Sequence, residues 1–155
     1  MKYSVLIFIG WAGMAQASCP DPFLPAETYN ATGPDLIAPQ SWAVQATAEA
    51  QVPCADWAEN DVLTHELVGY LPIAPSAVFN LEGMAPHILM VMADAQCDPI
   101  LAVRSGDGLW HFGQSANDRQ EVVVWGAPDG PLQVWVGSAR QTSCDATVIL
   151  ETFDR

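Results

Sequence analysis

The residues best suited to metal chemistry begin at His65. The segment 65–69 reads HELVG and opens like the H-E-x-x-H motif, in which two imidazoles one helical turn apart bind zinc. Gly69 stands where the second imidazole is required, so this zinc site is not predicted. His87 and His111 are isolated in the sequence, and we expect each to be a surface or hydrogen-bonded residue rather than a ligand.

The serines lack the setting that nucleophilic catalysis needs. A catalytic serine sits on a tight glycine-rich turn, with a histidine as base and a carboxylate to orient that base. The nearest match is the segment 105–108, SGDG, and a hairpin turn explains it fully. Lys2 is the only lysine, so a serine–lysine pair is excluded from the rest of the chain. We therefore expect no catalytic residues and no enzymatic activity, with a secreted peptidase as the alternative.

Calcium is the metal that the remaining carboxylates could hold, because its ligands are carboxylate and carbonyl oxygens. Asp98, Asp107 and Asp118 are the candidates, since each falls at a strand end or in a turn. No D-x-D-x-D-G loop is present. Aspartate also begins turns by bonding its own backbone, so solvated turn residues and no cofactor are the expectation, with calcium as the alternative.

Tryptophans provide the binding hypothesis. Aromatic side chains on the solvent face of a sheet can stack on sugars or contact a protein partner. Trp135 alternates with Val134 and Val136 and so points opposite to them. We take Trp110 and Trp135 as candidate binding residues. Core filling is the competing interpretation, favoured for Trp110 and Trp125 and evenly balanced for Trp135.

The N-terminus resembles an export signal. Lys2 precedes the apolar stretch 5–14, and the triplet 15–17 reads Ala-Gln-Ala. This order is typical of a secretory signal peptide, with cleavage expected after Ala17. The stretch is shorter than the roughly 20 apolar residues that cross a membrane, so we expect no membrane span. A lipoprotein anchored at Cys19 is the alternative, although the residue three positions earlier is not apolar. The expected location is periplasmic or secreted.

Composition limits the classes of partner. The chain has 155 residues, 18 of them acidic and five basic, with a formal net charge of −13. Phosphate contacts need clustered Lys and Arg, so nucleic acid is excluded as a partner. Half of the residues are hydrophobic, which excludes a disordered chain. One folded domain is expected.

Four cysteines fit an exported protein. They form an even set without a C-x-x-C pair, which favours disulfides over zinc or redox chemistry. Three pairings are possible. We favour Cys19–Cys54 and Cys97–Cys144, because the second would join the end of one strand to the start of the last.

Short apolar runs and turns predict an all-β protein. Eight or so strands at spacings of 8–12 residues indicate an antiparallel β-sandwich or jelly roll. Asp107-Gly108 and Ala127–Gly130 both have the sequence of hairpin turns. The stretch 42–51 could form a helix, but its period-two alternation favours a strand. The expected strands are 41–47, 77–81, 87–93, 100–103, 109–112, 121–125, 132–136 and 146–153.

These elements give a simple organisation. Residues 1–17 are the expected signal peptide, and residues 18–40 form an irregular proline-rich arm. Residues 41–155 form a single β-sandwich domain.

A series of segments from about 77 to 153 has a recognisable order: FNLEG at 79–83, the apolar strand 88–93, CDPILAV at 97–103, the turns at 107–108 and 127–130, VWVG at 134–137 and ATVIL at 146–150. This order resembles the bacterial pre-peptidase C-terminal domain, in its stand-alone exported form. The resemblance implies a secreted jelly-roll sandwich of the kind appended to peptidases. In many relatives, acidic residues after the aromatic strand could bind calcium, but residues 113–118 lack the paired acids.

Taken together, the sequence predicts a non-catalytic exported binding or accessory domain. The expected partner is a protein or glycan of the cell envelope. The alternative is a peptidase or a peptidase-associated domain.

Overall fold

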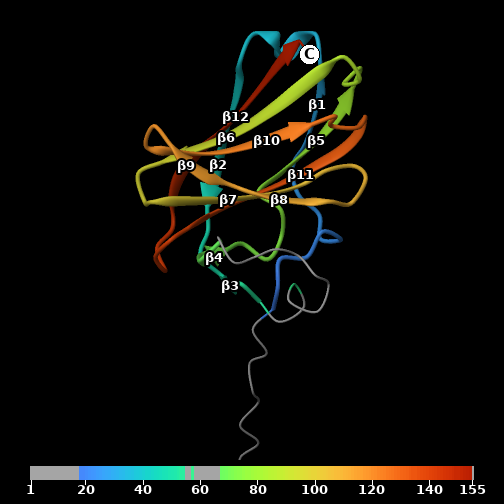
Figure 1. The fold of residues 1–155 in the computed structure, drawn as a ribbon. Coiled ribbons are helices and arrows are strands. Elements are labelled where there is room, and N and C mark those ends of the chain that lie inside the picture. Colours follow the sequence, from blue (N-terminus) through green and yellow to red (C-terminus); the bar gives the residue numbers. More distant parts are fainter. Residues whose placement is uncertain (1–17, 55–56, 58–66, 155) are drawn as a thin grey trace, which may run out of the picture.

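Two β-sheets face each other across a shared apolar interior (Figure 1). The structure, a computed structural model, describes residues 18–54, 57 and 67–154. The expected signal peptide and the HELVG histidine, His65, lie outside the described residues. Within the described part of the chain, no helix is long and apolar enough to cross a membrane.

One of the two sheets, which we call sheet B, has five strands in the order β2-β12-β6-β10-β9. All of its neighbouring strands run antiparallel. Its long central strands alternate buried and more exposed residues, as a half-buried sheet requires. The bounds are β2 Gln40–Ala46, β6 His87–Ala95, β9 Gln114–Ala116, β10 Arg119–Trp125 and β12 Cys144–Asp154.

The second sheet, sheet A, is built on β11. One edge of β11 pairs first with β5 and then with β4, and its other edge pairs with β7. Strand β8 pairs with β7. At Gly137 a side chain is impossible, because an added Cβ would fall 1.9 Å from the carbonyl oxygen of Tyr70 in β4. The bounds are β1 Thr28–Thr32, β3 Ala50–Val52, β4 Gly69–Leu71, β5 Ala77–Glu82, β7 Pro99–Arg104, β8 Trp110–Phe112 and β11 Gly130–Ser138.

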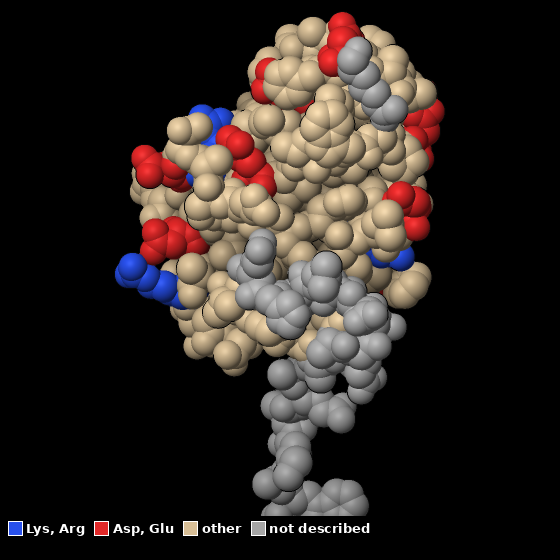
Figure 2. All heavy atoms as spheres, viewed as in Figure 1, with Lys and Arg blue, Asp and Glu red and all other residues tan. Residues whose placement is uncertain are grey.

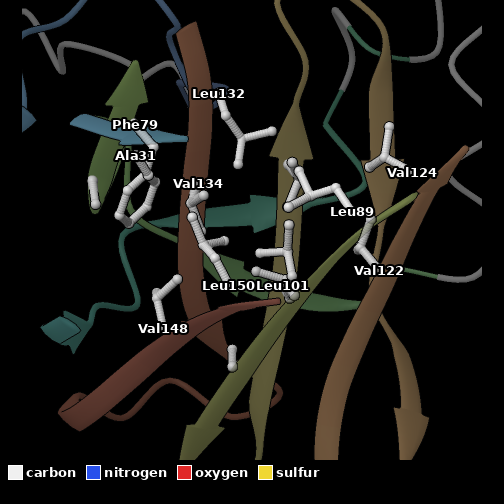
Figure 3. Close-up of a cluster of buried hydrophobic side chains, with 14 of the residues drawn as sticks. Ala31, Phe79, Leu89, Leu101, Val122, Val124, Leu132, Val134, Val148 and Leu150 are labelled. Atoms are coloured by element: carbon white, nitrogen blue, oxygen red, sulfur yellow. The ribbon is translucent and has the colours of Figure 1, made fainter. Parts of the chain in front are cut away.

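The main core fills the space between the sheets (Figure 3). Sheet B contributes Leu89, Val124 and Leu150, and sheet A contributes Leu101 and Val134. All five side chains are almost completely buried. Removing this apolar surface from water supplies the main driving force for folding.

The predicted sandwich and both predicted disulfides are confirmed. Cys19 pairs with Cys54, and Cys97 pairs with Cys144. The second pairing follows from strand order, because β6 ends just before Cys97 and lies beside β12, which begins at Cys144. Each of the eight expected strands is present within a few residues of its predicted bounds.

The turn at 127–130 was predicted as a hairpin, and that prediction is wrong. It joins β10 in sheet B to β11 in sheet A, and the two strands do not pair. The dipeptide Asp129-Gly130 provides a tight turn, with Gly130 at φ +115°, but it does not determine whether the chain returns along the same sheet. The turn at Asp107-Gly108 does form a hairpin, between β7 and β8.

Residues 18–40 differ from the irregular arm that the prolines predicted. Residues 28–32 form β1, which pairs with β5 in parallel, and Asp35–Ile37 form a short 3-10 helix, η1. The prolines flank β1 rather than interrupt it. Leu36 of η1 is fully buried, so this segment covers one end of the main core.

Candidate functional site

One serine–histidine pair converges in the described structure, at the β7–β8 hairpin. The Ser105 hydroxyl lies 3.0 Å from Nε2 of His111 and 2.5 Å from Oδ1 of Asp107. The Leu109 carbonyl oxygen lies 3.2 Å from the same hydroxyl. These are the three residue types of a catalytic triad: Ser105 and Asp107 come from the SGDG segment at 105–108, and His111 comes from β8.

The order of the contacts differs from that of a triad. In a triad, histidine accepts the serine proton and the carboxylate bonds the far side of the imidazole. Here the Ser105 hydroxyl donates its hydrogen bond to the Asp107 carboxylate. This leaves Nε2 of His111 to act as the donor to Ser105. Ser105 is also only 2% exposed. The arrangement fixes the hairpin and offers no accessible nucleophile.

Titration of this cluster follows from its contacts. The hydrogen bond from Ser105 lowers the pKa of Asp107, so the carboxylate is ionised at neutral pH. Burial lowers the pKa of His111, and the nearby Asp107 charge opposes that effect only in part. His111 is therefore neutral at neutral pH, which is compatible with a single Nε2 proton donated to Ser105.

The three aspartates proposed as calcium ligands do not lie together in the structure. Asp98 and Asp118 line one open hollow of about 740 Å³ beside β9, whereas Asp107 is held in the β7–β8 turn. Asp98 is also paired with Arg140, at 3.1 Å. Among the described residues there is no group of three or more His, Cys, Asp or Glu side chains arranged to hold a metal ion.

Trp135 and Trp110 belong to a second apolar cluster, on the outer face of sheet A. Trp135 is completely buried there, although it points away from the main core as its alternation with two valines predicted. Its ring lies 4.7 Å from that of Trp110, and its Nε1 donates to the Ile73 carbonyl. Trp57 covers this pair, with its ring centroid 4.9 Å from that of Trp110.

The covering side chains come from the segment between β2 and β5. Val52, Cys54 and Leu71 complete the cluster, and the Cys19–Cys54 disulfide ties it to the start of the described chain. Trp135 therefore cannot contact a partner directly, which corrects its assignment as a binding residue. Trp110 remains half-buried.

The outer face of sheet B has the opposite character. Trp125, at the end of β10, is 75% exposed, so the expectation that it fills the core is wrong. Strand register places Trp125 beside Ile88 of β6, and Ile88 beside Phe153 of β12. Phe153 is 41% exposed. Three strands thus contribute one continuous apolar row across the sheet.

Two further rows continue this surface. Val123, 42% exposed, lies beside Met90, and Met92 lies beside Ile149 in the next row. All alternate along their strands with core residues, so they lie on the outer side of the sheet. Ile88, Met90 and Ile149 are half-buried there, and Met92 is only 5% exposed. We call this surface the B face; it comprises Ile88, Met90, Met92, Val123, Trp125, Ile149 and Phe153.

Carboxylates are interspersed with the B face. Glu151 lies beside Met90, Glu121 lies beside Met92, and Asp94 follows on β6. The cation in these rows is Arg119, whose guanidinium contacts the Met92 sulfur at 3.4 Å. Figure 2 shows one side of the molecule, on which acidic groups are more frequent than basic groups.

An acidic hollow adjoins the Asp94 end of these rows. It has a volume of about 1420 Å³ and opens to solvent beside β2 and β12. Among the charged residues that line it, all are acidic: Glu27, Glu49, Asp94 and Asp145.

Sequence reasoning missed the B face, although a signal for it was present. The segment 121–125, EVVVW, was recognised as a strand. In such a strand Val123 and Trp125 must share one side and Val122 and Val124 the other. The charged residue Glu121 lies on the same side as Trp125, and this is the signal that could have identified the outward face.

No family model matches the sequence, and no curated protein matches it. The fold is similar to a solved structure, the pre-peptidase C-terminal domain of a collagenase from Bacillus anthracis, at 10% sequence identity. The match covers 84% of this chain and 98% of that chain, with a TM-score of 0.45.

Proposed function

We propose that this chain is an exported, non-catalytic binding module that contacts its partner through the B face. The observation that carries the proposal is the group of exposed apolar side chains around Trp125, in which Trp125, Val123 and Phe153 are 75%, 42% and 41% exposed and Ile88, Met90 and Ile149 are half-buried. Contiguous apolar patches are uncommon on monomeric soluble proteins and mark interaction sites, whereas isolated exposed residues do not.

The composition of the B face supports this role. Tryptophan, phenylalanine and methionine are enriched at the centres of protein interfaces, and truncation of a central tryptophan often has a large effect on binding. Cross-strand neighbours hold Trp125 and Phe153 on a regular sheet rather than on a loop. The surface is therefore preorganised, which reduces the entropy lost on binding.

One feature supports export, and a second supports the solubility of the module. The two disulfides fit an oxidising compartment, because cytosolic thiols are kept reduced. The high net negative charge favours solubility. The proposed partner is a protein or glycan of the cell envelope.

A retention experiment tests the B face. The protein is immobilised and exposed to a cell-envelope extract, and the retained components are compared between the wild type and the double variant Trp125→Ser/Phe153→Ser. A matched control is Phe23→Ser, which removes an aromatic side chain that is 90% exposed and lies outside the two sheets. We expect the double variant to lose a component that the control retains. Equal retention by all three proteins would contradict the proposal.

The alternative, a peptidase, has the Ser105–His111 contact in its favour. Against it stand the burial of Ser105 and the direct contact between Ser105 and Asp107. A fluorophosphonate probe separates the two functions. We expect no labelling, and labelling that Ser105→Ala abolishes would establish an accessible nucleophile.

Metal dependence is part of the same proposal. We expect the module to bind its partner without a metal cofactor. Asp98 and Asp118 line the same hollow, but Asp107, the third candidate ligand, lies outside it. Melting temperatures measured with calcium and with chelator should be equal, since a ligand that binds the native state raises the melting temperature. A rise with calcium that Asp118→Asn removes would instead place a site at this hollow.

A further inference from the structure

The B face combines two chemistries that limit what can bind it. Its seven apolar side chains are aliphatic, thioether and aromatic, and carboxylates adjoin two of its three rows. We infer that the partner is a polypeptide segment with alternating or clustered apolar and basic side chains, which lies across β10, β6 and β12. This inference rests on the proposed function and specifies the partner of the same face.

The apolar rows favour a polypeptide over a glycan. Sugars need planar polar groups beside an aromatic platform, because each hydroxyl removed from water must be hydrogen-bonded. Around Trp125 the structure instead places Ile88, Val123 and Phe153. Met90, which is half-buried, adds flexible, polarisable surface, which is typical of sites that accept peptide side chains.

The carboxylates favour a basic partner. Glu121 and Glu151 are partly buried beside the methionines, and no ion pair in the described structure includes either of them. A bound apolar segment would remove water from these carboxylates, which is costly unless an opposite charge pairs with them. Lysine or arginine on the partner supplies that charge. The adjoining hollow, with Glu49, Asp94 and Asp145, extends the same negative field beyond the face.

Charge also argues against a second copy of this chain as the occupant. Packing two B faces together would place Glu121 and Glu151 of each copy near those of the other, with Arg119 as the nearby cation. Like charges brought together at an interface oppose association. The formal charge of −13 adds repulsion at longer range.

The dimensions of the face set the length of the partner. Trp125 and Phe153 are two strand spacings apart, roughly 10 Å, and Ile88 and Met92 are four residues apart on β6, roughly 13 Å. An extended segment of about four residues spans these rows, and a longer segment is needed to reach the acidic hollow as well. Binding of such a segment should weaken at high salt, because its attraction is partly between exposed charges.

Direct titration with defined peptides tests the inference. The probe is a fluorescein-labelled peptide of about 12 residues that contains leucine and lysine. Two matched peptides replace every lysine by glutamate or every leucine by serine. Fluorescence anisotropy gives Kd for the wild type, Trp125→Ser, Glu151→Gln and the control Glu82→Gln. Glu82 is an exposed residue of sheet A, so this control removes the same charge from elsewhere.

We expect the leucine–lysine peptide to bind best, with Trp125→Ser weakening it about tenfold and Glu151→Gln about threefold. Glu82→Gln should leave Kd close to that of the wild type. Equal binding of the glutamate peptide, or equal effects of the two glutamine variants, would overturn the inference of a basic partner. Self-association that Trp125→Ser abolishes would identify a second copy instead. Retention of a glycan or acidic protein in the extract experiment would keep the B face as a binding site and reject the basic polypeptide.

Discussion

The outer faces of the two sheets both carry tryptophan, but only one of them is covered by the chain in the described structure. On sheet A, Trp135 is fully buried beneath Trp57 and the residues around the Cys19–Cys54 disulfide. On sheet B, Trp125 is 75% exposed beside Ile88 and Phe153. The same residue type thus has a structural role on one face and is available to a partner on the other.

This difference shows why sequence alone misassigned the two tryptophans. Trp135 points away from the main core, as the flanking valines predicted, yet a distant segment covers it. No local pattern at 132–136 contains that information. Trp125 is the reverse case, because its apolar neighbours favoured burial and nothing in the described chain packs over it.

The largest expected effect comes from breaking the covered face. Trp135→Ala should lower the free energy of unfolding by about 3–5 kcal/mol, because it removes a fully buried aromatic side chain and leaves a cavity. Urea denaturation followed by circular dichroism measures this change. A loss below about 1 kcal/mol would mean that the second cluster does not stabilise the fold.

Loosening the cover should have the next largest effect. The double variant Cys19→Ser/Cys54→Ser opens a disulfide with a sequence separation of 35 residues and should cost about 2–4 kcal/mol. Acrylamide quenching of tryptophan fluorescence should increase, because Trp57 and Trp135 lose part of their cover. Unchanged quenching would show that the cover holds without this bond.

A smaller, pH-dependent effect on stability is expected at β8. Trp110 and Phe112 of this strand lie on the covered outer face of sheet A, and His111 points to the opposite face of the same sheet. Burial lowers the pKa of His111 in the folded chain below its ordinary value of 6.5. Below that pH the unfolded chain binds more protons, so stability falls as the pH drops below about 6.5. When the pH is lowered from about 7.5 to 5.5, the melting temperature of His111→Gln should therefore fall less than that of the wild type. Equal losses would assign the effect to other groups.

The smallest effect on stability is expected on the open face. Trp125→Ala should change the free energy of unfolding by no more than about 0.5 kcal/mol, because the side chain is 75% exposed in the native state. The urea experiment used for Trp135 gives the comparison directly. A loss similar to that of Trp135→Ala would mean that Trp125 is structural, and the two faces would then be alike.

More of the fold than of the candidate site could be predicted from the sequence. Period-two alternation and turn residues gave eight strands, and Cys97 and Cys144 paired because they end and begin neighbouring strands. The sequence could not indicate that β10 and β11 belong to different sheets, since a tight turn at Asp129-Gly130 serves both arrangements. Strand β9 was missed although Asn117 and Asp118, both at positive φ, are residue types that tolerate a two-residue hairpin turn.

The candidate site depended on register, which is a long-range property. Trp125, Ile88 and Phe153 are distant in the sequence and become neighbours only when β10, β6 and β12 align. Likewise, Ser105 and His111 converge as expected for a hairpin, but only the three-dimensional contacts reveal that Asp107 bonds the serine.

Hydroxyl-radical footprinting of the tryptophans tests the central claim most directly. In the free protein, Trp125 should be oxidised readily and Trp135 protected, in line with their exposed fractions of 75% and 0%. Addition of the leucine–lysine peptide at saturation should protect Trp125 and leave Trp135 unchanged. Protection of Trp125 in the free protein, or oxidation of Trp125 that the bound peptide does not reduce, would contradict the assignment of the B face as the binding surface.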